Sequence, residues 1–354
     1  MSAGTETKSL SIEPQPFFSI VIPVRNDEKN IAKCLAALQQ LNFPSAQFEV
    51  IVVDNGSTDK TVEVAKSFGA GYSSFQLLSR PNVNISAVRN AGAAVARGRC
   101  LAFLDSDCEP RVEWLETASQ AISTGATGVF GAFYLVPDSS SWIARHWYQD
   151  WESKPPGEVS FLPAGDLFVN KDTFEKVKGF DESIQTNEDF ELCQRIRAAG
   201  LPVTNMPELG VIHWGTPQTL GGFFRRNRWH GMHVFRVFLR NLPLLHNLKP
   251  VALAVYTLLC LTGVFTSILV SLWTKQFWLP LGFFAALIAP PVLLGIRAAT
   301  SSRRIGSFAP MTLLFLVYGI ARASCLLDWG NWVASVETHD RGVGIPRATK
   351  QEKS

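Results

Sequence analysis

The chain has 354 residues, 47% of them hydrophobic, and a net charge of only +3. A charge this small argues against a protein that binds nucleic acid by neutralising phosphates. The hydrophobic share is more than a soluble enzyme needs, and the excess lies after Lys249. The six cysteines form no Cys-x-x-Cys pair and no zinc-like spacing, so we expect free, buried thiols.

The first part of the chain alternates short apolar runs with amphipathic segments. Residues 1–16 are polar and lack the apolar core of a secretory signal, so we expect a disordered tail there. The pattern then predicts strands at 18–22, 48–53 and 101–104, and helices at 28–41, at 59–68 with Ser57 or Thr58 as the cap, and at 87–97. Such repetition predicts a parallel sheet covered by helices on both faces.

The region after this is less regular. We expect a strand at 128–136, an amphipathic helix at 142–151 and a helix at 186–199. The segment 142–151 carries Trp142, Trp147 and Trp151 beside Tyr148. These rings are compatible with stacking on sugars, with a lipid surface or with the core.

Long uncharged segments follow Lys249. Residues 250–274 and 276–296 contain no charge, and each is long enough to cross a bilayer, which takes about 20 apolar residues. Residues 305–321 form a shorter third candidate, and Pro290-Pro291 should kink or end the second helix. Arginines precede the first span and lie between the second and third. The positive-inside rule therefore predicts a multi-pass protein of the cell inner membrane with its catalytic domain in the cytoplasm.

Acidic residues end two of the predicted strands. Asp54 follows one strand, and Asp105 and Asp107 follow another, which is where open α/β sheets bind ligands. Positions i and i+2 of an extended segment point the same way, so Asp105 and Asp107 can jointly meet one Mg²⁺ or Mn²⁺ ion beside a phosphate. The alternatives are an Asp-rich turn before a helix at Glu109-Pro110 and ordinary turn chemistry at 54–59.

Asp189 is the candidate base. Residues 186–189 read Thr-Asn-Glu-Asp, which resembles a capping box and places Asp189 in the first turn of a helix. The positive helix end favours its ionised form, and a base must be ionised before it accepts a proton. The alternative is an acid that only stabilises the helix start.

An ordered series of motifs resembles the signature of family 2 glycosyltransferases, which are inverting enzymes of the GT-A fold that use nucleotide sugars. It runs over residues 17–230 and comprises Val21–Glu28, Val52–Asp59, Ala87–Gly92, Phe103–Asp107, Gly179–Glu182, Asn187–Asp189 and Arg225–Trp229. The hydrophobic C-terminus resembles that of membrane-attached members that build surface polysaccharides or glycolipids.

The resemblance implies a role for each matching position. Asp54 would contact the nucleobase in a pocket shaped by Pro23 and Arg25, and Arg89 would line the nucleotide site. Asp105 and Asp107 would flank a metal-bound diphosphate, Asp107 most directly, with His213 as a further metal ligand. Asp189 would be the general base, and Asp166 would touch the donor sugar. In the basic motif, Arg226 or Arg228 would supply positive charge for the leaving diphosphate, and Trp229 would brace a lid. The alternative is that this cluster forms a basic collar beside the membrane.

Three positions depart from the family pattern: Arg25 stands where an aromatic residue is common, Asn55 where many members have a second acid, and Arg225 where processive synthases carry Gln. The last departure argues for single additions. We therefore expect a GT-A domain at 17–240, a membrane region at 249–327 and a polar tail at 328–354, whose side of the membrane stays open.

The expected reaction moves one sugar from a UDP-sugar or GDP-mannose to a polyprenyl-linked saccharide or glycolipid, with no nucleic acid involved and with partner proteins of a polysaccharide pathway possible. The competing hypotheses are a processive polysaccharide synthase, a nucleotidyltransferase, and a non-catalytic membrane adaptor that keeps the fold.

Overall fold

The computed structural model describes residues 17–152, 154–184, 186–240, 248–301 and 304–327. The predicted tails at 1–16 and 328–354 lie outside the described residues. Packing divides the chain after Gln218 into two units, which are described separately.

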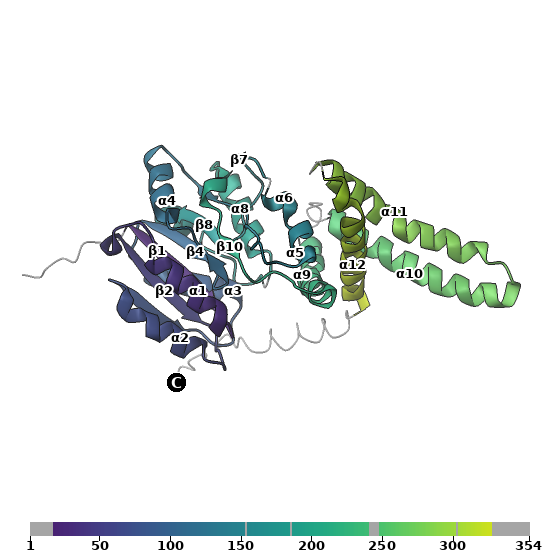
Figure 1. The fold of residues 1–354 in the computed structure, drawn as a ribbon, viewed down its shortest axis with the longest axis horizontal. Coiled ribbons are helices and arrows are strands. Elements are labelled where there is room, and N and C mark those ends of the chain that lie inside the picture. The colour runs from purple at the N-terminus through teal and green to yellow at the C-terminus, as the bar shows by residue number, and fades with distance from the viewer. Residues whose placement is uncertain (1–16, 153, 185, 241–247, 302–303, 328–354) are drawn as a thin grey trace, which may run out of the picture. The chain divides into compact units, whose positions relative to one another are not determined.

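The first unit alternates strands and helices (Figure 1). Its strands are β1 Phe18–Val24, β2 Phe48–Asp54, β3 Phe75–Ser79, β4 Cys100–Leu104, β5 Cys108–Glu109, β6 Val129–Gly131, β7 Gly157–Glu158, β8 Asp166–Asn170, β9 Val203–Asn205 and β10 Ile212–His213. Its α-helices are α1 Glu28–Gln39, α2 Thr61–Phe68, α3 Ile85–Val95, α4 Trp114–Ser123, α5 Trp142–Trp147, α6 Gln149–Glu152, α7 Lys171–Lys176 and α8 Glu188–Ala198.

The main sheet has the strand order β3-β2-β1-β4-β8-β6-β9-β7. Its first four strands are parallel, as predicted, but β8 runs antiparallel to both β4 and β6. The expectation of a parallel sheet is therefore right up to β4. Beyond β4, strands β8 and β7 run antiparallel to their neighbours, whereas β6 and β9 pair in parallel. Strand β3 was not predicted; it is an edge strand with mostly half-buried side chains. A separate pair joins β5 to β10.

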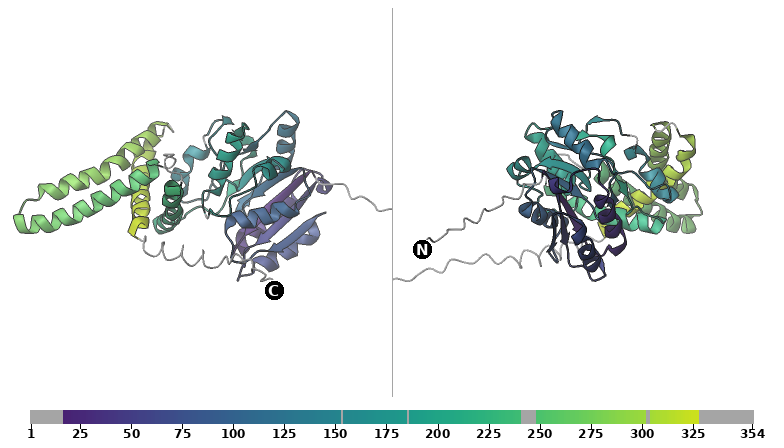
Figure 2. Two further views of the ribbon diagram at one scale, coloured as in Figure 1. Left: turned by 180° about the vertical axis from the view of Figure 1, so that it is seen from behind. Right: turned by 60° about the vertical axis from the view of Figure 1, so that its left-hand side comes forward.

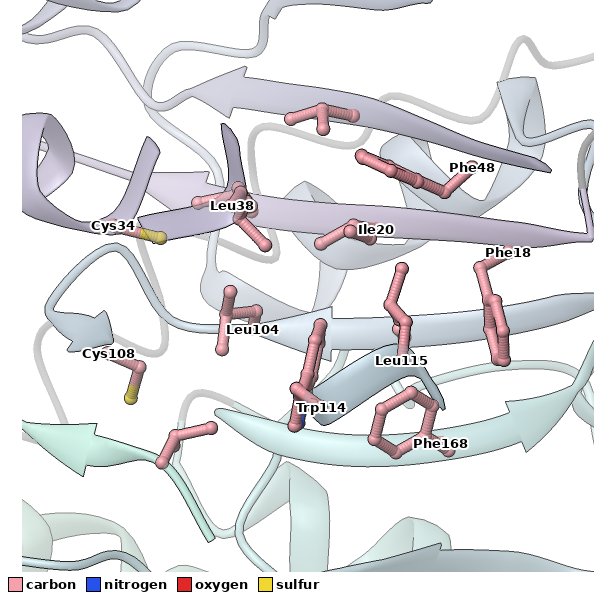
Figure 3. Packing of buried hydrophobic residues seen from close by; sticks show 14 of the residues in the cluster. Phe18, Ile20, Cys34, Leu38, Phe48, Leu104, Cys108, Trp114, Leu115 and Phe168 are labelled. Atoms are coloured by element: carbon pink, nitrogen blue, oxygen red, sulfur yellow. The ribbon is translucent and has the colours of Figure 1, made fainter. Parts of the chain in front are cut away.

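Helices cover both faces of this sheet (Figures 1 and 2). On one face, Ile20 and Ile22 of β1 pack with Cys34 and Leu38 of α1 and with Trp114 of α4 (Figure 3). On the other face, the alternate side chains of β1 and β2 pack with α3 and α8. The period-two alternation of buried strands thus fills two separate clusters. All six cysteines are free and buried, as expected.

Two predicted helix starts are shifted. Helix α2 begins at Thr61, and neither Ser57 nor Thr58 caps it; instead Asp59 Oδ1 accepts a hydrogen bond from the Thr61 amide at 3.0 Å. Helix α8 begins at Glu188 after Asn187, which has a φ of 64° and makes no side-chain cap bond. The predicted capping box is therefore wrong, although Asp189 does lie in the first turn.

The tryptophan-rich segment forms the two short helices α5 and α6. Trp151 lies 5.2 Å from Tyr148 and 5.4 Å from Phe133, ring centre to ring centre. Trp142 is exposed at 37%. Trp151 therefore belongs to the core, and the other tryptophans keep both interpretations open.

The second unit consists of α9 Leu220–Arg240, α10 Leu248–Thr274, α11 Trp278–Ser301 and α12 Phe308–Leu327. Three segments in it are long and apolar enough to cross a membrane: Leu248–Thr274, Trp278–Ser301 and Ile305–Leu327, the last with a mean hydropathy of 1.6 over 23 residues. The third is thus longer than predicted. Pro290 and Pro291 lie inside α11 and do not end it.

Glu49 supports a stability prediction, because it is a buried acid on β2 with several donors. Its carboxylate accepts hydrogen bonds from Ser19 Oγ at 2.6 Å and from the Arg97 amide and Nε at 2.6 and 3.1 Å. We expect Glu49→Gln to lower the free energy of unfolding by about 2–3 kcal/mol, because charged acceptors contribute that much and the new amide donor faces other donors. Thermal unfolding of the full chain in detergent measures this, with the exposed Glu63→Gln as the matched control. An equal melting temperature for the two variants would contradict the prediction.

Candidate active site

The carboxyl ends of β1, β2 and β4 lie along one edge of the sheet. These strands are neighbours in the order β2-β1-β4 and run parallel, so Val24, Asp54 and Leu104 end them on the same side. Strand spacing separates β2 from β4 by about 10 Å. The predicted acids therefore emerge along one edge.

Asp54 is buried, and its carboxylate closes the turn after β2. It accepts hydrogen bonds from the amide of Gly56 at 3.0 Å and of Ser57 at 3.2 Å. Gly56 has a φ of +74°, a conformation that side chains rarely adopt. Asp54 therefore forms the turn that one interpretation predicted. Its predicted contact with a ligand at this strand end stays a prediction. Pro23 is buried within β1, and Arg25 is exposed just after it.

Asp105 is held by a buried arginine rather than pointing with Asp107. Residues 105–107 form a turn, not the extended segment that we expected. The guanidinium of Arg89, on α3, lies 2.6 Å from Asp105 Oδ1 through Nη2 and 2.6 Å from Glu188 Oε1 through Nη1. Arg89 therefore ties the end of β4 to the first turn of α8. The sequence did not single out Glu188 for this role.

Asp107 points to a different group. Its Oδ2 lies 3.4 Å from His213 Nε2, and donor atoms of Asp107, Cys108 and His213 all lie within 4.8 Å of one another. A carboxylate, a thiol and an imidazole are all metal ligands. These three residues could therefore hold a cation; the predicted pair of Asp107 and His213 is together, Cys108 was missed, and Asp105 is not part of the group.

Tyr134 contacts Asp105 directly and reaches Asp107 through His213, on which its ring stacks. Its hydroxyl donates to Asp105 Oδ2 at 3.2 Å and accepts from the Gly165 amide at 3.1 Å. Its ring stacks on His213 with 4.5 Å between ring centres. Burial raises the pKa of Tyr134 well above its usual value, and the charges that add to this shift are those of Asp105, Cys108, Asp107 and Asp189. Tyr134 thus contacts Asp105 and His213, and sequence reasoning missed it.

Asp189 has the most informative electrostatics of the site. Burial, and then the charge of Glu188, raise the pKa of its carboxyl to about 7, while the amide of Phe190 donates to Oδ1 at 2.7 Å. Arg89 acts against this shift. A carboxyl with a pKa near neutrality can exchange protons at physiological pH.

Asp166 has a partner in the core that the resemblance did not imply. It is completely buried, and its Oδ1 accepts a hydrogen bond from Trp114 Nε1 at 3.0 Å. Burial raises the pKa of this carboxyl well above its usual value. Asp166 is a buried residue at the start of β8, and its contact with a sugar stays a prediction.

Arg226, Arg228 and Trp229 lie on α9, in the second unit. The two arginines are half-buried there, and Trp229 is 48% exposed. The expected action of these three side chains on the diphosphate stays a prediction.

Two protein-family models match large parts of this chain. The model of "Glycosyl transferase family 2" matches residues 19–179, and that of "Glycosyl transferase family group 2" matches residues 112–318. Glycosyltransferase AglE of Haloferax volcanii is 33% identical over 207 residues, which cover 57% of this chain and 68% of AglE. The chain belongs to glycosyltransferase family 2. It is a transferase with a GT-A fold.

Other similarities are more distant. The pre-mycofactocin glycosyltransferase of Mycobacterium tuberculosis is 29% identical over 55% of this chain, and a beta-monoglucosyldiacylglycerol synthase of Nostoc is 24% identical over 60% of it. The matches span only 42% and 48% of those two proteins. Among solved structures, the mannosyltransferase PcManGT of Pyrobaculum calidifontis, in complex with GDP-Man and Mn²⁺, gives a TM-score of 0.60 at 18% identity, covering 89% of this chain and 88% of PcManGT. That likeness concerns the fold.

The raised pKa of Asp189 predicts a stability effect. In the unfolded chain an aspartate ionises near its ordinary pKa of about 3.9, so between that pH and about 7 the folded transferase binds more protons than the unfolded one. Stability therefore falls as pH rises through this window. We expect Asp189→Asn to stabilise the full chain at pH 8 by on the order of 1 kcal/mol, after allowance for solvent screening, and to lose this advantage at pH 5.

Thermal unfolding of both proteins between pH 5 and 8 checks this. Asp138→Asn, at an exposed position, is the control. A difference between Asp189→Asn and the parent protein that does not change with pH would refute a raised pKa.

Proposed function

We propose that this transferase moves one sugar from a nucleoside diphosphate sugar, a UDP-sugar or GDP-mannose, to a hydroxyl of a lipid-linked acceptor at the cytoplasmic face of a membrane. The observation that carries the proposal is that Arg89 lies 2.6 Å from both Asp105 and Glu188, and so joins the turn that carries Asp107 to the helix start that carries Asp189. The acids come from two separate motifs of the chain. They supply the two needs of an inverting transfer: a cation site for the leaving diphosphate and a base on the acceptor side.

A divalent cation fits the donor set. Asp107 and His213 would hold it, with their facing atoms 3.4 Å apart. When bound, such a cation neutralises charge on the leaving diphosphate. The Mn²⁺ in the complex of PcManGT, a protein of similar fold, supports a divalent cation of the Mg²⁺ or Mn²⁺ type.

Asp189 would take the proton of the acceptor hydroxyl. Its carboxyl is partly exposed, at the start of α8, and its pKa of about 7 makes it a stronger base than an ordinary aspartate. Glu188 beside it already forms an ion pair with the guanidinium of Arg89. The geometry therefore favours Asp189 over Glu188 for proton transfer.

The second unit supports a membrane acceptor. Its three apolar helices indicate membrane association, and an anchored enzyme gains most when its acceptor is also in the membrane. The beta-monoglucosyldiacylglycerol synthase relative has a lipid in its name. The arginines before α10 and between α11 and α12, set against a single Lys275 between α10 and α11, support a cytoplasmic site.

The testing experiment is a donor screen by nucleotide release, with purified full-length protein, Mn²⁺ or Mg²⁺ and a polyprenyl-linked acceptor. We expect release from one nucleotide sugar, with a single residue added per acceptor. Asp107→Ala and Asp189→Asn should each lower kcat/KM at least 100-fold, the scale expected for general base and charge-stabilising groups. Asp138→Asn is the surface control.

The pH profile tests the role of Asp189 directly. Because the base must be ionised, kcat/KM should rise about tenfold per pH unit below the pKa of about 7 and level off above it. Long products would favour a processive synthase. Undiminished biological function of both Asp107→Ala and Asp189→Asn would favour a non-catalytic adaptor, and absence of turnover or binding with every nucleotide sugar would end the proposal.

Arg89 gives a prediction that separates two roles. The resemblance implies that it lines the nucleotide site, whereas its contacts indicate that it positions Asp105 and Glu188. Lysine keeps the charge but lacks the fork that reaches both acids. We therefore expect Arg89→Lys to lower kcat by about 10–100-fold, since small misplacements of reacting groups cost that much, and to change the donor KM less than threefold.

A rise in the donor KM with unchanged kcat would instead support direct nucleotide binding by Arg89. Arg97→Lys is the matched control, because Arg97 pairs with the buried Glu49 and contacts none of the site acids in the described hydrogen bonds. Thermal unfolding of each variant shows whether the fold is retained.

A further inference from the structure

Cys108 lies at the centre of a rigid frame built from two short strands. In the antiparallel pair of β5 and β10, Cys108 is directly opposite His213, so the two side chains leave the same face of the pair. The amide of Trp214 donates to the carbonyl of Asp107 at 2.8 Å, and the amide of His213 donates to the carbonyl of Leu135 at 2.9 Å. Backbone pairing thus holds Asp107 and Cys108 of one strand segment beside His213 of the other.

The spacing of the donor atoms matches that of ligands on one cation. With metal–ligand lengths of about 2.0–2.1 Å for oxygen and nitrogen and about 2.3 Å for sulfur, tetrahedral angles place O and N about 3.4 Å apart and O and S about 3.5 Å apart. The observed separations are 3.4 Å from Asp107 Oδ2 to His213 Nε2 and 3.9 Å from Asp107 Oδ1 to Cys108 Sγ. The first separation fits ligation of one ion; the second starts from the other carboxylate oxygen and is ~0.4 Å longer than tetrahedral ligation needs.

Close packing limits how far the donors can move. A Cβ added to Gly215 would lie 1.8 Å from Asp107 Oδ2, so a larger residue there would displace this carboxylate. The ring of His213 is 3% exposed and is covered by the parallel ring of Tyr134. Figure 3 shows Cys108 at the same end of the hydrophobic cluster as Leu104, the last residue of β4.

We propose that Cys108 is a third protein ligand, so that Asp107, Cys108 and His213 bind a thiophilic divalent cation such as Zn²⁺ or Co²⁺ in preference to Mg²⁺. Mg²⁺ takes oxygen ligands and an octahedral shell, whereas thiolate and imidazole favour Zn²⁺ and Co²⁺. Binding forms a metal–sulfur bond and releases the thiol proton to solvent. Three protein ligands leave a position open, as in catalytic metal sites. The proposal rests on the proposed function and revises its cation: at the site that would face the diphosphate, the thiol ligand shifts the preference from Mg²⁺ toward a thiophilic ion.

Cobalt spectroscopy tests this without relying on activity. Full-length protein in detergent is stripped of metal with a chelator and titrated with Co²⁺. We expect a sulfur-to-cobalt charge-transfer band in the near ultraviolet for the parent protein, and none for Cys108→Ser. Zn²⁺ affinity should fall at least tenfold in Cys108→Ser, the lower end of the loss known even for residues one step removed from a metal, while Mg²⁺ affinity should change less than threefold.

Cys34→Ser is the matched control. Cys34 is the other buried thiol near the acids, with its Sγ 3.9 Å from the carbonyl of Asp105, and it is outside the three-residue donor group. It should keep the charge-transfer band. If Cys108→Ser unfolds, Cys108→Ala and Cys108→Asp replace it; the aspartate variant should bind cobalt without the band and gain affinity for Mg²⁺.

Two outcomes overturn the inference: no band in the parent protein at saturating Co²⁺, or a band that survives in every Cys108 variant. A donor screen on the same preparations keeps the two proposals apart. Mn²⁺-supported sugar transfer by a protein without the band leaves the transferase standing and removes the Cys108 ligand. A Cys108-dependent band in a protein that turns over no nucleotide sugar establishes the ligand and removes the transferase proposal.

Discussion

The buried guanidinium of Arg89 organises the first unit, because it holds two acids that come from distant parts of the chain. Asp105 ends a central strand, and Glu188 begins a helix more than eighty positions later; one planar cation binds both at 2.6 Å. Without it, two carboxylates would be buried close together with no compensating charge, which is costly in a low-dielectric interior. Besides burial, the charge of Glu188 raises the pKa of the neighbouring Asp189 and that of Arg89 lowers it, so the electrostatics of Asp189 depend on this same pair.

Much of the parallel half of the sheet could be predicted from the sequence. The strands at Phe18–Val24 and Phe48–Asp54 are continuous apolar runs, and the helix after each has a clear apolar face. Such periodic patterns are local, so they are readable in a single sequence. The edge strand β3 and the reversal at β8 were missed or mistaken, because edge burial and strand direction depend on tertiary partners.

The sequence predicted several residues of the candidate site, but not how they are arranged. Asp105 and Asp107 were expected to act as a pair, but the turn between them directs one to Arg89 and the other to His213. Cys108 reached the site through its pairing with His213, which lies over a hundred positions away in the chain. Tyr134 has no motif around it that marks its role. Contacts of this kind arise from sequence-distant pairing, and no spacing rule reveals them.

The reversal of strand direction at β8 has an evolutionary consequence. Because β8 runs opposite to β4, its first residues, beginning at Asp166 opposite Leu104, arrive at the catalytic edge without a crossover helix. Strands β1, β2 and β4 are thereby complete before the chain enters β8, and β8 joins them to the later part of the sheet. Insertions and substitutions in that later part leave the pairing of β1, β2 and β4 untouched. The fold thus separates the strands that pair in parallel around β1 from those that join the sheet through β8.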